Sequence, residues 1–253
     1  MSSTSVVAID IGNTSAHVAI GYRAEAKWQH ILRFAPDPGR SADEWFSLFF
    51  AHASLSQPIE AVVCCSVVPA VTDPLLEAAE RVWQVDPLLV TSLFDFSIEL
   101  ATDYPELTGT DRVVNANRAW VTCGGPVIVV DCGTATKVDA VTADGRFIGG
   151  SIAPGLMMGM TALATGTAQL SSVSPRYPES AIGSNTRDAI LSGTIRGHAR
   201  MIEGQIADMQ TEIGKARSVI LTGGAHPYLL SGLRTEVSAV PTLTLDGLKM
   251  LVD

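Results

Sequence analysis

Two short stretches of the sequence combine an aspartate, a glycine and hydroxyl side chains in the pattern of a phosphate-binding turn. They are Asp10-Ile-Gly-Asn-Thr14 and Asp131-Cys-Gly-Thr-Ala-Thr136. Glycine lets backbone N–H groups approach phosphate oxygens, and the hydroxyls add donors. A carboxylate beside them can hold Mg2+ through water, because this ion keeps several waters and takes few carboxylates. We predict that Asp10 holds Mg2+ in this way, that the first turn binds phosphate, and that the second binds the other side of a polyphosphate or a monovalent cation; the alternative is a pair of ordinary hairpin turns.

A third polar group, Gly109-Thr-Asp-Arg112, stands where a helix is expected to begin. Asp111 could accept the proton of an attacking hydroxyl during phosphoryl transfer. Arg112 could hold a carboxylate or the transferring phosphate in a fork geometry. The structural alternative is an N-cap with a local ion pair. With two phosphate turns, the pattern favours a kinase, although spacing alone does not identify the acceptor.

Several common site motifs are absent from the sequence. Gly214-Lys215 is followed by Ala216, so there is no Walker loop, and neither a dinucleotide fingerprint nor a nucleophile-elbow motif occurs. The 4 cysteines have no Cys-x-x-Cys spacing and the 5 histidines are scattered singly, so we expect reduced core cysteines and no zinc site.

The two aspartate turns sit in similar surroundings. The first turn follows a short apolar run at residues 6–11, and an extended pattern resumes at residues 17–20. The second turn likewise follows an apolar run at 126–131, and the extended pattern resumes at 137–141. This weak internal repeat predicts a duplicated two-domain α/β fold, with coincidence as the alternative. We place the domains at residues 1–118 and 119–253.

The remaining elements follow from periodicity and capping signals. The expected elements are a helix starting at the Ser41-x-x-Glu44 capping box, a strand at 61–68, a helix opening at Asp73-Pro74, a helix from Gly109 to Gly124, a long helix at 185–213 and a strand at 218–221 that ends in a Gly223-Gly224 turn. The uncharged run from Phe147 to Pro175 is interrupted by glycines and predicts a buried loop and helix rather than a membrane span.

Composition limits the function classes. The chain has 253 residues, of which 47% are hydrophobic and 17% charged, enough for a sizeable core, and its net charge of −9 argues against a nucleic-acid partner. A small anionic substrate remains compatible with that charge. The N-terminus lacks a basic segment followed by an apolar core, so we expect a cytoplasmic protein without a membrane partner.

A series of motifs, taken in order, resembles the type III pantothenate kinases. They are Asp10-Ile-Gly-Asn-Thr14, Ser66-Val-Val-Pro69, Gly109-Thr-Asp-Arg112, Asp131-Cys-Gly-Thr-Ala-Thr136, Ile182-Gly-Ser-Asn-Thr186 and Leu243-Thr-Leu-Asp-Gly247. The resemblance implies the actin-like fold of acetate and sugar kinases, with two ribonuclease-H-like domains and an interdomain ATP cleft. It also implies transfer of the γ-phosphate of ATP to pantothenate, which gives 4'-phosphopantothenate in the first step of coenzyme A biosynthesis.

The same resemblance implies a set of site residues. Asp111 would be the general base, and Asp131 would hold a monovalent cation, K+ or NH4+. The ATP contacts would be Asp10, Ile11, Gly12, Asn13, Thr14, Ser15, Ala16, His17 and Thr134. The pantothenate contacts would be Tyr104, Gly109, Thr110, Asp111, Arg112 and Thr186, with Thr186 contributed across a homodimer interface.

The sequence departs from the family pattern at a few positions. Lys137 stands where the family usually has Thr, and its ammonium could pair with ATP phosphates, lie near Asp131 and lessen the need for potassium, or simply face solvent. The connection between Tyr104 and Gly109 is short, Thr110 replaces a common Ala, and Gly166 replaces a frequent Arg. These changes bear on substrate affinity rather than on the fold.

Two other functions fit the pattern. One is another small-molecule kinase or phosphatase of the same superfamily, and the other is a non-enzymatic or weakly active relative, like the accessory factors of virulence-gene expression. The Gly109–Arg112 motif favours pantothenate over other acceptors. Asp10, Asp111 and Asp131 together favour an active enzyme.

Overall fold

The computed structural model describes residues 4–52, 58–166 and 172–252. The chain separates into two compact units. The first unit comprises Met1–Phe96, Tyr104–Arg118 and Thr244–Asp253, and the second comprises Ser97–Asp103 and Ala119–Leu243.

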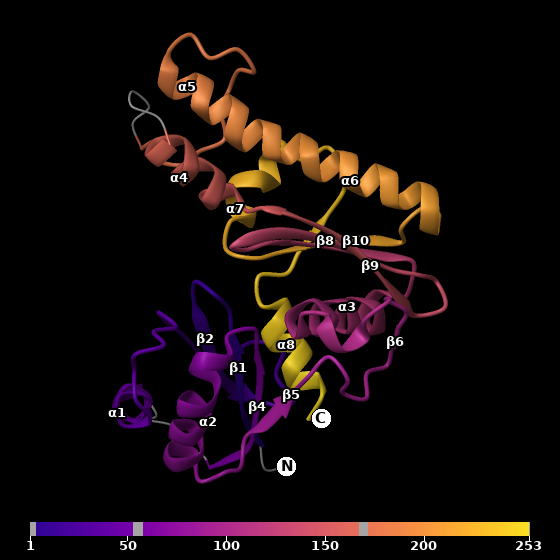
Figure 1. Ribbon diagram of the computed structural model, residues 1–253. Helices are drawn as coiled ribbons and strands as arrows, with labels where there is room; N and C mark the ends of the chain where they lie inside the picture. The colour runs from indigo at the N-terminus through magenta and orange to yellow at the C-terminus, as the bar shows by residue number, and fades with distance from the viewer. Residues whose placement is uncertain (1–3, 53–57, 167–171, 253) are drawn as a thin grey trace. The chain divides into compact units, whose positions relative to one another are not determined.

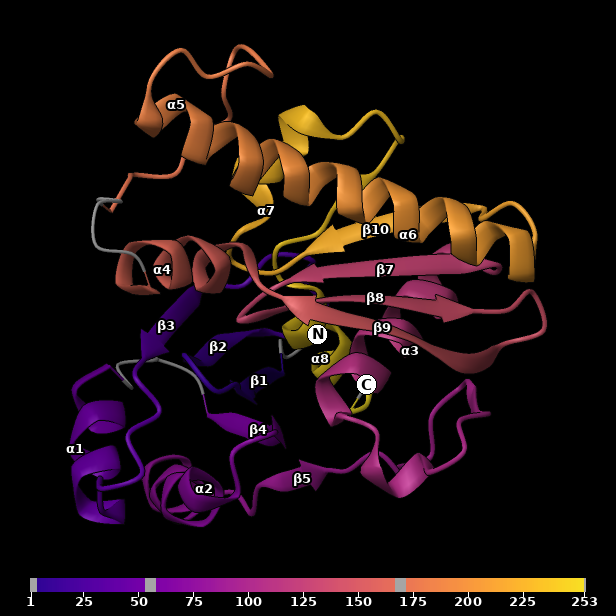
Figure 2. The same ribbon diagram turned by 45° about the horizontal axis from the view of Figure 1, so that its top comes forward.

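The first unit is built on a five-stranded sheet in the order β3-β2-β1-β4-β5 (Figures 1 and 2). Its strands are β1 (Ser5–Ile11), β2 (Ala16–Tyr22), β3 (His30–Phe34), β4 (Ile59–Ser66) and β5 (Leu88–Val90). Strands β1, β2 and β3 run antiparallel in succession, whereas β4 and β5 extend the sheet in parallel from β1.

Helices cover both faces of this sheet. On one face, α1 (Ala42–His52) and α2 (Pro69–Trp83) bury Trp45, Phe49 and Leu75 against alternate residues of β1, β2 and β4. On the other face, Val114 of α3 (Thr110–Cys123) joins Leu245 and Leu248 of α8 (Leu243–Met250) in a second core cluster. The central strands of this mixed sheet are therefore buried on both faces.

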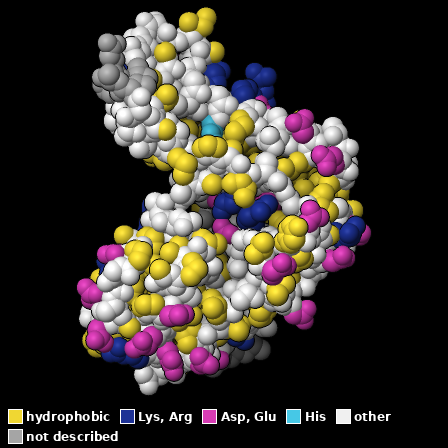
Figure 3. Space-filling view, viewed as in Figure 1, with side chains coloured by type: hydrophobic (Ala, Val, Ile, Leu, Met, Phe, Trp, Pro, Cys, Tyr) yellow, Lys and Arg dark blue, Asp and Glu magenta, His cyan; other side chains and the backbone are white. Residues whose placement is uncertain are grey.

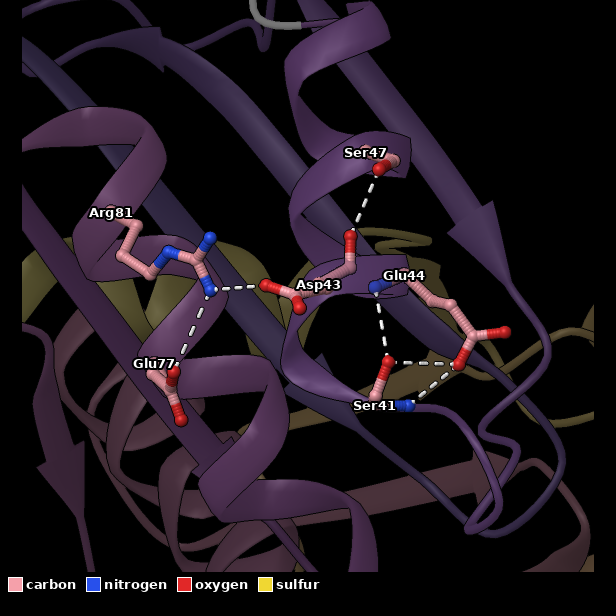
Figure 4. A network of polar contacts seen from close by, with 6 residues as sticks. All are labelled: Ser41, Asp43, Glu44, Ser47, Glu77 and Arg81. Atoms are coloured by element: carbon pink, nitrogen blue, oxygen red, sulfur yellow. Dashed lines mark hydrogen bonds and ion pairs between the residues drawn. The ribbon is translucent and has the colours of Figure 1, made fainter.

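The start of α1 confirms the predicted capping box (Figure 4). The Ser41 hydroxyl accepts a hydrogen bond from the Glu44 backbone N–H at 3.3 Å, and the Glu44 carboxylate accepts one from the Ser41 backbone N–H at 2.8 Å. Asp43, next to this cap, pairs with Arg81 of α2 at 2.8 Å and so links the two helices.

The predicted start of the second helix was wrong. The helix opening expected at Asp73-Pro74 lies inside α2, which begins at Pro69. Pro69 takes the first-turn position where the missing N–H costs nothing, and the turn before Pro74 is held by burial of Val71 in the core.

The second unit contains a six-stranded sheet in the order β11-β10-β7-β8-β9-β6. Its strands are β6 (Glu99–Leu100), β7 (Val127–Cys132), β8 (Ala135–Val141), β9 (Arg146–Pro154), β10 (Ser218–Thr222) and β11 (Ser238–Ala239). One face is covered by α4 (Leu156–Gly166), α5 (Thr186–Leu191), α6 (Gly197–Ile213) and α7 (His226–Leu229), which bury a common core with β7, β8 and β10.

Two segments of this unit refine the predictions. The long helix expected at 185–213 is helical throughout, but a π-helical segment at Ser192–Arg196 joins α5 to α6. In the Phe147–Pro175 run, residues up to Pro154 form strand β9 instead of a loop, because they pair with β8 along its length. The predicted helix is α4, and residues 167–171 lie outside the described part of the chain. Within that part, no helix combines the length and apolarity needed to cross a membrane.

The strand orders of the two units repeat each other. Without β6, the second sheet reads β9-β8-β7-β10-β11, which matches β3-β2-β1-β4-β5. The directions also match, since β7, β8 and β9 are antiparallel in succession and β10 and β11 follow in parallel. The internal repeat seen in the sequence is therefore a repeat of topology.

The contact-based units differ from the predicted division at 1–118 and 119–253 in two segments. Residues 97–103 belong to the second unit because β6 pairs with β9. Residues 244–253 belong to the first unit, where the Trp28 indole N–H donates to Asp246 at 2.7 Å and the Lys249 ammonium donates to the Glu25 carbonyl at 2.7 Å. The C-terminal helix thus returns to cover a face of the first sheet.

Candidate active site

The first aspartate turn closes the β1–β2 hairpin of the first unit. Asp10 lies directly across the ladder from His17, and His17 Nδ1 is 3.7 Å from Asp10 Oδ2. The turn itself is closed by the Gly12 N–H, which donates to the Ser15 carbonyl at 3.0 Å. Asn13 and Thr14 are exposed at its tip, where backbone and hydroxyl donors can meet a phosphate.

Cys65 of β4 contacts the aspartate of the first turn. Its buried thiol, one residue before the end of β4 and next to β1, donates to Asp10 Oδ1 at 3.6 Å. Burial raises the pKa of the Cys65 thiol well above its usual value, and the charges of Asp10, Cys64 and Asp111 raise it further. The thiol therefore stays protonated and acts as a hydrogen-bond donor to the Asp10 carboxylate.

The start of α3 fixes the direction of Asp111. Its Oδ1 accepts a hydrogen bond from the Arg112 backbone N–H at 2.9 Å, and Arg112 N–H also reaches the Gly109 carbonyl at 3.0 Å. A Cβ on Gly109 would come within 2.8 Å of Asp111 Oδ1, so glycine leaves the room that this carboxylate occupies. Thr110 is buried. Tyr104 is 65% exposed and precedes a single 3-10 turn, Pro105–Leu107, that leads to this segment.

The second aspartate turn closes the β7–β8 hairpin of the second unit in the same manner. Asp131 lies directly across the ladder from Lys137, and Lys137 Nζ is 2.7 Å from Asp131 Oδ2. The Lys137 side chain is 16% exposed and the Asp131 side chain is 14% exposed. Of the interpretations of Lys137, the structure supports the one that places its ammonium beside Asp131.

Glycines pack closely around this second turn. A Cβ on Gly223, which follows β10, would overlap Asp131 Oδ1 and the backbone of Cys132. A Cβ on Gly155 would overlap the carbonyl oxygens of Gly133 and Thr134. The Gly223-Gly224 turn predicted at a strand end therefore buttresses the Asp131 loop, and Thr134 is left exposed at its tip.

The aspartates of the two hairpins differ in their room for a cation. Asp10 offers one partly exposed carboxylate near hydroxyls, which fits Mg2+ held through water. Among the described residues, no cluster of three or more His, Cys, Asp or Glu could hold a metal. Asp131 does not fit a monovalent cation, because an ammonium already occupies one of its oxygens.

Thr186 begins α5 in the second unit and is exposed. The helix is capped by Asn185, whose side-chain oxygen accepts from the Asp188 N–H at 2.9 Å. A Cβ on Gly183 would overlap the backbone of Ala189, so the Ile182–Thr186 motif folds tightly against the first turn of the helix. This explains the glycine of the motif and leaves the Thr186 hydroxyl at a surface.

Side-chain contacts that the sequence did not predict also shape the two turns. Cys65 was taken only as a core residue, although its position at the end of β4 carried the signal. The Thr136 hydroxyl lies 2.8 Å from His198 Nε2 of α6, and burial lowers the pKa of His198. Nothing in the spacing of these two residues indicated the pair.

Charged side chains do not form one large patch on the face drawn in Figure 3. On the face in Figure 3, acidic side chains are spread over the surface and Lys and Arg occur in small separate groups.

Similarity to known proteins shows the family of this chain. A sequence model of type III pantothenate kinase matches residues 6–208. The chain belongs to the type III pantothenate kinase family. A type III pantothenate kinase of Thermomicrobium roseum is 38% identical over 251 residues, covering 96% of this chain and 95% of the relative. One from Exiguobacterium sibiricum is 37% identical over 252 residues, covering 98% of each.

Solved structures place this pantothenate kinase family member in the predicted fold class. A ROK family glucokinase from Streptomyces griseus, in complex with glucose and AMPPNP, is similar with a TM-score of 0.57 and 14% identity, covering 98% of each chain. The ethanolamine utilization protein EutJ from Carboxydothermus hydrogenoformans is similar with a TM-score of 0.55 and 13% identity, and the match covers 99% of this chain and 90% of that one. The predicted actin-like fold of acetate and sugar kinases is confirmed.

Proposed function

We propose that this protein transfers the γ-phosphate of ATP to the primary hydroxyl of pantothenate, giving 4'-phosphopantothenate and ADP in the first step of coenzyme A biosynthesis. The observation that carries the proposal is family membership over nearly the whole chain. The partly exposed carboxylate of Asp10 and the oriented carboxylate of Asp111 support it, because phosphoryl transfer needs both a metal-binding carboxylate and a base.

Asp111 is the proposed base. It takes the proton of the pantothenate hydroxyl as the oxygen attacks the γ-phosphorus, while the bond from that phosphorus to the ADP oxygen breaks. Its backbone hydrogen bond to Arg112 and the space left by Gly109 hold the carboxylate in one direction. Such preorientation raises the rate because positioning supplies much of the catalysis in this reaction class.

The proposed ATP contacts are the turn residues 10–17 of the first unit and Thr134 of the second. The exposure of Asn13 and Thr14 at the first turn tip and of Thr134 at the second supports this assignment. Asp10 would hold Mg2+ through water, and that ion would supply positive charge to the phosphate oxygens. A cytoplasmic location is part of the proposal, because the reaction consumes ATP and a small metabolite.

The proposed pantothenate contacts are Tyr104, the segment Gly109–Arg112 and Thr186. Arg112 offers a planar fork that matches the carboxylate of pantothenate. Thr186 is exposed at a helix start, which suits a residue that completes the site of a partner subunit in a homodimer. Sedimentation analysis would test the dimer directly.

The decisive experiment measures ADP release by the purified protein with ATP and Mg2+, in the presence of pantothenate, acetate, glucose or no acceptor. We expect release with pantothenate alone. Comparable release with acetate or glucose would indicate another small-molecule kinase, and ATP binding without turnover on any acceptor would indicate an accessory or regulatory protein.

The role of Asp111 has its own test. Asp111→Asn keeps size and shape but cannot accept the proton, so kcat should fall by about 100- to 10,000-fold while ATP binding is retained. Asp86→Asn is the matched control, because Asp86 is an exposed carboxylate of the same unit. Near-normal turnover of Asp111→Asn would reject the base assignment.

A further inference from the structure

We propose that the ammonium group of Lys137 replaces a bound monovalent cation at Asp131, so that this enzyme turns over without K+ or NH4+. The inference rests on the proposed kinase function, and it concerns the charge that neutralises the second phosphate turn. It starts from the ion pair between the two side chains, which a bound cation would have to displace.

The backbone fixes this pair in place. Lys137 faces Asp131 in the β7–β8 ladder, and on its other side it is paired with Ile152 of β9. Strand β8 is therefore held between two neighbours, and opposite charges directly across a ladder stabilise each other. The ammonium cannot be moved away without breaking the pairing or rotating a side chain that is only 16% exposed.

The carboxylate is equally confined. Gly223 and Gly133 pack against Asp131 Oδ1, where a Cβ would overlap it in the first case and lie 3.3 Å away in the second. The other oxygen, Oδ2, is the one 2.7 Å from Lys137 Nζ. A second cation would have to approach a carboxylate whose charge is already neutralised, and would meet a like charge at close range.

The electrostatic result is an ion pair whose positive member is permanently present beside the second phosphate turn. A lysine ammonium is a compact point charge, as K+ and NH4+ are, and it needs no free ion to be present. Thr134, at the tip of the same turn, is a proposed ATP contact. Lys137 is thus a positioning residue that holds Asp131 and its turn in the form that receives phosphate.

The test compares the wild-type chain with Lys137→Thr in choline chloride and in KCl at equal ionic strength. Turnover with ATP and pantothenate is one readout. The other is the thermal unfolding midpoint without ATP, because an ion that binds only the folded state raises that midpoint. Lys215→Thr is the matched control, since Lys215 is an exposed lysine of the same unit.

For the wild type and Lys215→Thr, we expect turnover within about twofold in the two salts and the same midpoint. For Lys137→Thr, turnover in choline should fall by about 10- to 100-fold, as expected when a fixed stabilising charge is removed from a phosphate site. KCl should restore most of that turnover and raise the midpoint. Lys137→Met retains the aliphatic stem and should behave in the same way if the Thr variant does not fold.

Three results would overturn the proposal. They are activation of the wild type by K+, full activity of Lys137→Thr in choline, and a loss in both Lys137 variants that KCl does not restore. Absence of turnover by the wild type in every salt would count against the kinase function instead. In that event the dependence of the midpoint on K+ would still test the role of Lys137.

Discussion

Gly223 is the position where a single methyl group should damage the second phosphate turn most. Its φ is 86°, a conformation that residues with a side chain rarely adopt, and a Cβ would overlap Asp131 Oδ1 and the Cys132 backbone. Backbone strain costs about 1 to 3 kcal/mol, and an overpacked site about the same. Because main-chain atoms cannot rotate away, Gly223→Ala should lower the free energy of unfolding by about 2 to 6 kcal/mol.

Alanine variants of two other glycines separate the cost of backbone strain from the cost of overpacking. Gly214 has a φ of 80° and a ψ of 177°, but a Cβ there would meet nothing within 4 Å, so Gly214→Ala carries the strain alone, about 1 to 3 kcal/mol. Gly224 has neither the unusual φ nor a close neighbour, and Gly224→Ala should stay within about 0.5 kcal/mol of the wild type.

Urea denaturation of the variants gives the free energies, and hydrogen exchange measured by mass spectrometry shows where protection is lost. Exchange is needed because two units can unfold separately. For Gly223→Ala, protection should fall in β7 and β10 and remain in β1 and β4. The reasoning fails if Gly223→Ala is no more destabilised than Gly214→Ala.

Three further predictions use the same assays. Ser41→Ala should lower the free energy of unfolding by about 1 kcal/mol through loss of the α1 cap, whereas Ser47→Ala, which loses only a bond to the Asp43 carbonyl within the helix, should be near neutral. Because burial lowers the pKa of His198 from 6.5, the folded state resists protonation, so stability should be full above pH 6.5 and decline as pH falls through the lowered pKa. A urea series over that range should show a smaller decline for His198→Gln. Alkylation at pH 8 should label Cys123, which is partly exposed, before the other three cysteines, which are buried. Early labelling of those three would show that they are accessible to the reagent.

Local signals carried most of the correct predictions. Each aspartate turn could be found because an apolar run, a glycine and hydroxyl residues occur within a few positions, and such a hairpin is specified by its own sequence. The α1 cap was equally local, with Ser41 and Glu44 three residues apart. The repeated topology followed from finding the same hairpin twice.

The predictions that failed depended on contacts between distant segments. Pro69 and Pro74 were both acceptable near a helix start, and burial of Val71 in the core decided between them. The glycines of β9 indicated a loop, but Gly150 packs against Asp139 and the Val138 carbonyl, where a side chain would overlap them. The return of α8 to the first unit depends on Trp28 and Asp246, which are 218 residues apart.

The two hairpins show how one motif can serve two electrostatic tasks. In each, the aspartate that ends the first strand faces a basic residue across the ladder. His17 stands 3.7 Å from Asp10 and is charged only when protonated, whereas Lys137 stands 2.7 Å from Asp131 and carries a permanent charge. Asp131 is therefore paired with a fixed positive charge within its own hairpin, whereas the partner of Asp10 is an imidazole. This difference agrees with the proposed roles, in which the first turn would hold Mg2+ and the second would contact phosphate oxygens directly.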